Sequence, residues 1–160
     1  MKGSVAVGAR AIIRWVLGIL FIWAALSKLA NPTSFLGSIL AYEMPLPEML
    51  VRLTAVTLPW LELLCGLTLL ANFWTESSLA VMFLLFSVFI VATGSAWARG
   101  LDISCGCFDL SMIGISAESD TMKFIESARF AFFRNLLLTS LVGYLFVSTL
   151  RSRARAEKPA

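Results

Sequence analysis

The sequence predicts an all-α integral membrane protein, a four-helix bundle, and its composition, its long apolar stretches and the placement of its charges support that prediction. Hydrophobic residues make up 59% of the 160 residues and charged residues only 14%, a composition that is rare in a soluble domain. Four apolar stretches are each long enough to cross a hydrocarbon core of about 30 Å as a helix. We expect spans at about 11–29, 53–73, 77–98 and 130–150, so that residues 1–150 form the bundle and residues 151–160 a basic tail.

Basic residues flank both ends of the chain and predict the orientation of the helices. Lys2, Arg10 and Arg14 lie at the start of the first span, and four more follow the last span: Arg151, Arg153, Arg155 and Lys158. The protein is then expected in a bacterial inner membrane. The positive-inside rule places both of its termini in the cytoplasm and the two longer loops outside. The first stretch is too long for the apolar region of a signal peptide, so we expect it to be a retained helix. The same topology accounts for the net charge of +3 without a nucleic-acid partner.

The first outer loop, residues 30–52, is expected to hold an interfacial segment. Prolines interrupt this loop and flank a short amphipathic stretch around Phe35, Ile39 and Tyr42. A stretch of this kind typically lies along the membrane surface instead of crossing it. The second outer loop, residues 99–129, carries two cysteines and is the more informative of the two.

The cysteines of the second outer loop, Cys105 and Cys107, are the first candidate for chemistry. The sequence has no histidine, which excludes imidazole haem ligation, His-bearing zinc sites and Ser-His-Asp hydrolysis. A disulfide between two residues separated only by Gly106 closes a small, strained ring, and strained disulfides are readily reduced. Thiol–disulfide exchange is therefore the favoured role. A structural clip and a copper(I) site made of two thiolates are the alternatives.

Polar residues inside the predicted spans are the second candidate. Glu62 lies within the second span, where an isolated carboxylate is costly unless it is protonated or paired. Arg134 and Asn135 occur at a comparable depth in the last span, and Lys28 lies at the outer end of the first. We expect Glu62 and Arg134 to form an ion pair, and the cluster to lie beneath the cysteine loop, where it lowers a thiol pKa or binds a head group. Cys65, in the middle of the second span, is expected to be a packing residue.

Four segments combine these polar residues in a recognisable pattern. They read GILFIWAALSKLANPTSF at 18–35, LPWLELLCGLTLL at 58–70, RGLDISCGCFD at 99–109 and FFRNLLL at 132–138. Together they resemble the MauE/DoxX family of small four-helix membrane proteins over about residues 12–150. The resemblance marks six polar positions as characteristic of the family: Lys28, Glu62, Cys105, Cys107, Arg134 and Asn135. The family's usual CxCFG motif has glycine where this chain has Asp109.

The resemblance implies a role in thiol redox chemistry or in the maturation of periplasmic proteins, as in formation of the disulfide-rich small subunit of methylamine dehydrogenase. It also implies work beside thioredoxin-like proteins, and related DoxX-type proteins are associated with quinone-linked sulfur oxidation. On this basis we expect Cys105 and Cys107 to exchange with a periplasmic thioredoxin-fold partner or a disulfide-containing client, with a quinone as one candidate electron acceptor. The alternatives are a non-catalytic assembly or maturation factor for a periplasmic redox enzyme, and a small proton-coupled transporter that uses Glu62.

Overall fold

The computed structural model describes residues 2–44, 47–101 and 128–156, and these residues are mostly helical. Four helices are long and apolar enough to cross a membrane: α1 (Lys2–Ala30), α3 (Glu48–Leu70), α4 (Thr75–Ala98) and α6 (Ala128–Ala156). A fifth and shorter helix, α2 (Pro32–Ala41), connects the first two spans. The predicted all-α membrane bundle is confirmed, although α3 begins and ends several residues earlier than the stretch expected at 53–73.

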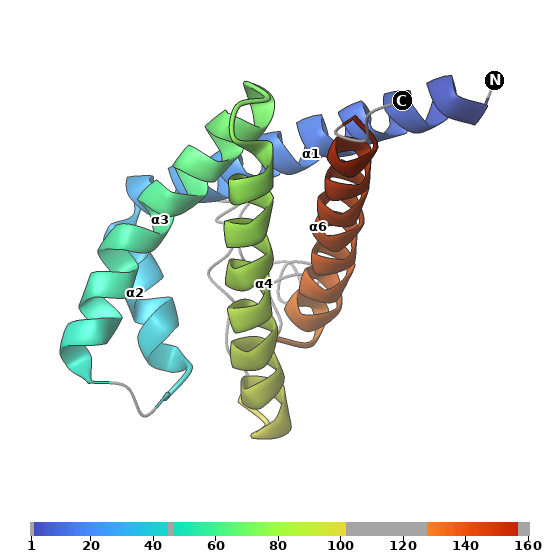
Figure 1. The fold of residues 1–160 in the computed structure, drawn as a ribbon. Coiled ribbons are helices and arrows are strands. Elements are labelled where there is room, and N and C mark those ends of the chain that lie inside the picture. The colour runs from blue at the N-terminus through green and yellow to red at the C-terminus, as the bar shows by residue number, and fades with distance from the viewer. Residues whose placement is uncertain (1, 45–46, 102–127, 157–160) are drawn as a thin grey trace, which may run out of the picture.

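The helices pack in two pairs. α1 packs along α3, and α4 packs along α6, while α3 and α4 join the pairs through a tight turn (Figure 1). α2 lies beside the first half of α3, so these two helices extend together at one end of the bundle (Figure 1). The first turns of α1 and the last turns of α6 lie at the other end (Figure 1). α1 is inclined to α4 and α6 in this view.

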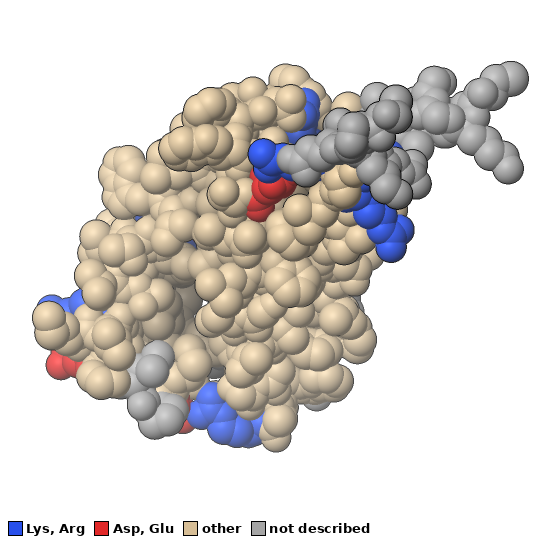
Figure 2. All heavy atoms as spheres, in the orientation of Figure 1, with Lys and Arg blue, Asp and Glu red and all other residues tan. Residues whose placement is uncertain are grey.

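Apolar side chains fill the bundle and also cover its outside. The central cluster draws on all four spans and comprises Leu17, Phe21, Cys65, Leu69, Leu79, Met82, Phe86, Val142 and Leu145. Many large apolar side chains point outward, among them Ile19, Val56 and Leu137. Figure 2 shows the charged side chains near the two ends of the molecule, with an almost entirely uncharged band between them. A surface of this kind suits contact with lipid chains.

Arginines join the helices at the end that holds the start of α1 and the end of α6. Three polar contacts connect elements there: Arg10 to Ser152, Arg14 to Asn72, and Arg153 to Glu76. Arg10 Nη1 donates to Ser152 Oγ over 2.7 Å, and Arg153 Nη1 lies 2.7 Å from Glu76 Oε2. This end of the bundle is called the basic end below.

The short helix α2 occupies the region expected to lie along the membrane interface. Pro32 is suited to its first turn, where a missing N–H costs no hydrogen bond, and only Asn31 separates α2 from α1. Phe35 and Tyr42 are both 4% exposed, and Tyr42 packs with two small residues of α4, Ala92 and Ala96. α2 therefore packs onto the spans and covers part of the bundle.

Two glycines allow α1 and α3 to approach closely. A Cβ atom at Gly66 would lie 2.9 Å from the carbonyl oxygen of Gly18 and 3.1 Å from the backbone nitrogen of Ile22. These are backbone atoms of α1, which cannot move aside unless the whole helix moves. Small residues at such crossings let membrane helices pack backbone to backbone, and the resulting van der Waals contact holds the helices together in lipid.

Gly66→Ala should lower the free energy of unfolding by about 1–3 kcal/mol, the usual cost of overpacking a tight contact, as measured by reversible denaturation in mixed micelles. Gly8→Ala in α1 is the matched control, because a Cβ atom there meets nothing within 4 Å. The control should be neutral or slightly stabilising, since alanine favours a helix over glycine. Equal stability of the two variants would contradict a close helix crossing at Gly66.

Candidate functional site

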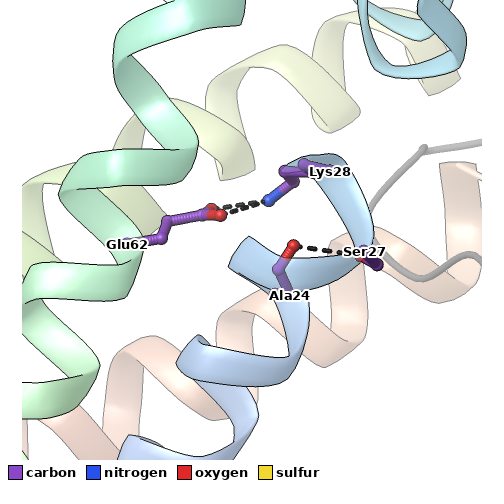
Figure 3. A network of polar contacts seen from close by, with 4 residues as sticks. All are labelled: Ala24, Ser27, Lys28 and Glu62. Atoms are coloured by element: carbon purple, nitrogen blue, oxygen red, sulfur yellow. Dashed lines mark hydrogen bonds and ion pairs between the residues drawn. The ribbon is translucent and has the colours of Figure 1, made fainter. Parts of the chain in front are cut away.

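A buried ion pair joins α1 to α3. Lys28 Nζ lies 2.6 Å from both carboxylate oxygens of Glu62 and donates a hydrogen bond to each (Figure 3). The two side chains are only 3% and 6% exposed, so the contact is shielded from solvent by the rest of the bundle. The sequence analysis expected Arg134 as the partner of Glu62, and the structure gives this role to Lys28.

Lys28 reaches Glu62 because of its position on α1. It stands in the last turn of that helix, and helical side chains lean toward the N-terminus of their helix, so its ammonium group points back into the bundle. A cation in the last turn also interacts favourably with the helix dipole. The neighbouring Ser27 hydroxyl donates to the carbonyl oxygen of Ala24 over 3.0 Å (Figure 3), so it is satisfied within α1 and leaves the Glu62 oxygens to Lys28.

Two aromatic rings enclose the ammonium group of Lys28. The ring centroid of Phe35 in α2 lies 5.2 Å from Lys28 Nζ, and that of Phe89 in α4 lies 5.6 Å away. Both distances are within the range of cation–π attraction, which is stronger when the cation is removed from water. The attraction of the two rings therefore offsets part of the free energy that Lys28 loses when it is removed from water. Sequence reasoning missed this role, because Phe89 is one apolar residue in an apolar run and Phe35 belongs to a stretch expected to lie along the membrane surface.

The predicted polar residues of α6 lie at the same place. Arg134 and Asn135 line a small cavity together with Lys28 and Glu62, and apolar residues of α1, α4 and α6 complete its walls. The structure thus brings four of the six predicted site residues together. Asn135 is only 3% exposed, and its Nδ2 atom has no hydrogen-bond partner among the residues that the structure describes. An amide held in this way is available to a small polar guest, for which water is the simplest candidate.

The cavity has a defined size and charge. Its volume is about 40 Å³, which is room for a few water molecules at most, because one needs roughly 10–15 Å³ by this kind of measure. An engineered cavity that takes up benzene measures about 150 Å³, so a quinone ring does not fit between these side chains as they stand. Two cations, one carboxylate and one amide line the space, which makes it suited to a small hydrogen-bond acceptor.

The three cysteines divide between the described and undescribed parts of the chain. Cys65 is 6% exposed and belongs to the central apolar cluster, which fits the predicted packing role. Cys105 and Cys107 lie outside the described residues. The chain that carries them leaves α4 after Ala98 and enters α6 at Ala128.

Comparison with known proteins gives one family and one curated relative. The family model described as methylamine utilisation protein MauE matches residues 7–148. The methylamine utilization protein MauE of Methylophilus methylotrophus is 39% identical over 85 residues, which are 52% of this chain and 44% of the relative. The alignment with this relative therefore covers less than half of its length. No solved structure matches the chain.

Replacing one member of the buried pair should leave an uncompensated charge in an apolar interior. Lys28→Met and Glu62→Gln should each lower the free energy of unfolding by about 3–5 kcal/mol, and the double variant should lose clearly less than the sum. A double-mutant cycle in mixed micelles measures this coupling.

The exposed pair of Glu48 and Arg52, one helical turn apart in α3, is the matched control for that cycle. Its atoms also lie 2.6 Å apart, but its side chains are 73% and 69% exposed. Its coupling should be only about 0.3–0.5 kcal/mol. Additive losses at Lys28 and Glu62 would show that the buried pair contributes no coupling.

Proposed function

Because this chain belongs to the MauE family of membrane proteins, we propose that it is the membrane component of a thiol–disulfide exchange system that matures a periplasmic redox enzyme. Cys105 and Cys107 are the exchanging pair in this proposal. The polar cluster of Lys28, Glu62, Arg134 and Asn135 supports the pair from within the bundle. The family and the relative are both named for methylamine utilisation, which favours a client from a redox pathway.

The observation that carries the proposal is the buried polar cluster near the start of α6. Arg134 and Asn135 lie within about two turns of Ala128, or roughly 10 Å along the helix axis. The segment with the two cysteines attaches to α6 at Ala128 and to α4 at Ala98. Buried charges inside a membrane bundle are costly and usually mark function. Cationic side chains close to a thiol favour its thiolate, which is the reactive form in exchange.

The proposed exchange conserves atoms and electrons. A partner thiolate attacks the sulfur of Cys105 in the Cys105–Cys107 disulfide, and Cys107 leaves as a thiolate that takes up a proton. A second partner thiol then loses its proton and attacks the partner's own sulfur in the mixed disulfide, which releases Cys105. The net result is one oxidised partner and one reduced cysteine pair, two electrons having moved. The reverse sequence reduces a partner disulfide.

The partner in this proposal is a periplasmic thioredoxin-fold protein or a disulfide-containing client. The protein then lies in the bacterial inner membrane, with both termini in the cytoplasm and the cysteines outside. The basic end supports this orientation, because it gathers Arg10, Arg14 and Arg153 at the end away from the α4 and α6 attachment points.

The alternatives to thiol–disulfide exchange are a proton-coupled transporter and a non-catalytic assembly factor. A proton-coupled transporter would need a carboxylate that faces a pathway, whereas both oxygens of Glu62 accept hydrogen bonds from Lys28. A non-catalytic assembly factor needs the same bundle but no cycling cysteines. The cysteine variants described below separate that function from the proposed exchange.

Labelling should establish the orientation first. In a Cys65→Ala background, a membrane-impermeant thiol reagent applied to intact, reduced spheroplasts should label Cys105 or Cys107. The control is Phe73→Cys in the turn between α3 and α4, made in a variant that lacks the three native cysteines. Phe73 is 58% exposed, and its replacement should be labelled only after lysis. The opposite pattern would overturn the orientation and, with it, the proposed exchange.

Trapping tests the chemistry itself. In the reverse direction Cys105 attacks a partner disulfide and Cys107 resolves the mixed disulfide, so in Cys107→Ser the mixed disulfide between Cys105 and its partner should accumulate and be visible on a non-reducing gel. Client maturation should stop in this variant, while Cys65→Ala should behave like the wild type because Cys65 packs in the core. If the variant with both Cys105 and Cys107 replaced by serine matures its client fully, the assembly-factor function takes the place of exchange.

A further inference from the structure

A second site lies at the basic end, far from the cysteine attachment points. A groove of about 570 Å³ runs between α1 and α6, and its lining combines arginines, hydroxyl groups and apolar surface. α1 contributes Arg10, and one face of α6 contributes Ser140, Gly143, Tyr144, Val147, Ser148, Arg151 and Ser152. We propose that this groove binds an anionic phospholipid, with the phosphate at Arg10 and Arg151 and an acyl chain along the second half of α6.

Charge is the first reason for this assignment. Arg10 and Arg151 line the groove, and none of its described lining residues is acidic. Arg10 Nη1 donates to Ser152 Oγ, which holds the guanidinium group against another residue of the groove lining. The Nε atom of Arg10 is buried and has no hydrogen-bond partner among the described residues. Guanidinium groups bind phosphate through charge-assisted hydrogen bonds, so a phosphate would satisfy this donor.

Depth is the second reason. The apolar spans of α1 and α6 cover Gly8–Ala30 and Phe130–Ala154, so Arg10 and Arg151 both stand within about one turn of the same end of the bundle. That is the level at which phospholipid head groups lie. Basic pockets between membrane helices at this level are typical sites for anionic head groups.

The shape of α6 is the third reason. Between Ser140 and Arg151 the groove face extends about 16 Å along the helix. Small side chains at Ser140, Gly143 and Ser148 leave it hollow beside Tyr144 and Val147. An acyl chain matches this long, partly apolar surface, whereas free phosphate would use only the arginines. The combination therefore favours a lipid over a soluble phosphate compound.

The test measures lipid binding by the purified full chain. Native mass spectrometry should show stronger binding of phosphatidylglycerol than of phosphatidylcholine. Arg151→Gln should weaken phosphatidylglycerol binding about fivefold, the effect of one basic residue near an anionic head group. Ser140→Leu fills the groove without a charge change and should weaken binding too. Arg52→Gln removes an exposed arginine at the other end and should leave binding unchanged.

Three outcomes would overturn the proposal. Equal binding of the two lipids would remove the role of charge, and an equal loss in Arg52→Gln would show a general effect of net charge. Competition by glycerol 3-phosphate at the affinity of the lipid would assign the site to a soluble phosphate. Arg151 is exposed and makes no side-chain hydrogen bond or ion pair with the other described residues, so its variant should fold even if a change at Arg10 does not.

Discussion

The buried contact between Lys28 and Glu62 constrains the arrangement of the other helices. Two charges removed from water lose several kcal/mol of solvation each, and their mutual attraction returns that loss only when their geometry is good and other groups assist. Groups on three other helices assist the pair. Phe35 of α2 and Phe89 of α4 lie near the ammonium group, and polar residues of α6 line the adjoining cavity. A pair of this kind adds little net stability, but it disfavours any packing in which one partner is left alone.

The length and apolar character of the spans made the fold predictable. The tilt of α1 could not be predicted from the sequence. The predicted depths treated each span as an upright helix, which put Lys28 at an outer edge and Arg134 beside Glu62. In the structure α1 is inclined, and α2 and the first half of α3 extend past its end (Figure 1). The end of α1 therefore meets the middle of α3. Helix tilt depends on neighbouring surfaces such as the crossing of Gly18 and Gly66, which no apolar window reveals.

The two ends of the bundle are closed by different kinds of contact. At the basic end, arginine side chains bond to side chains of other helices, as Arg10 does to Ser152. At the other end, Arg99 follows α4 and donates to the backbone carbonyl groups of Tyr42 and Glu43. This contact holds the chain after α2 against α4, and so keeps Phe35 close to Lys28.

The candidate site and the lipid groove share α1 and α6, and the spacing of their residues relates both to the thickness of a membrane. Lys28 follows Arg10 by about 27 Å along α1, and Arg151 follows Arg134 by about 25 Å along α6. The length along α6 is close to the hydrocarbon thickness of about 30 Å, whereas α1 is inclined and covers less depth than its length (Figure 1). If head groups hold Arg10 and Arg151 at one surface, Arg134 lies toward the opposite surface. Anchoring at the basic end would then fix the depth of the cluster in the membrane, without any direct contact between the two sites.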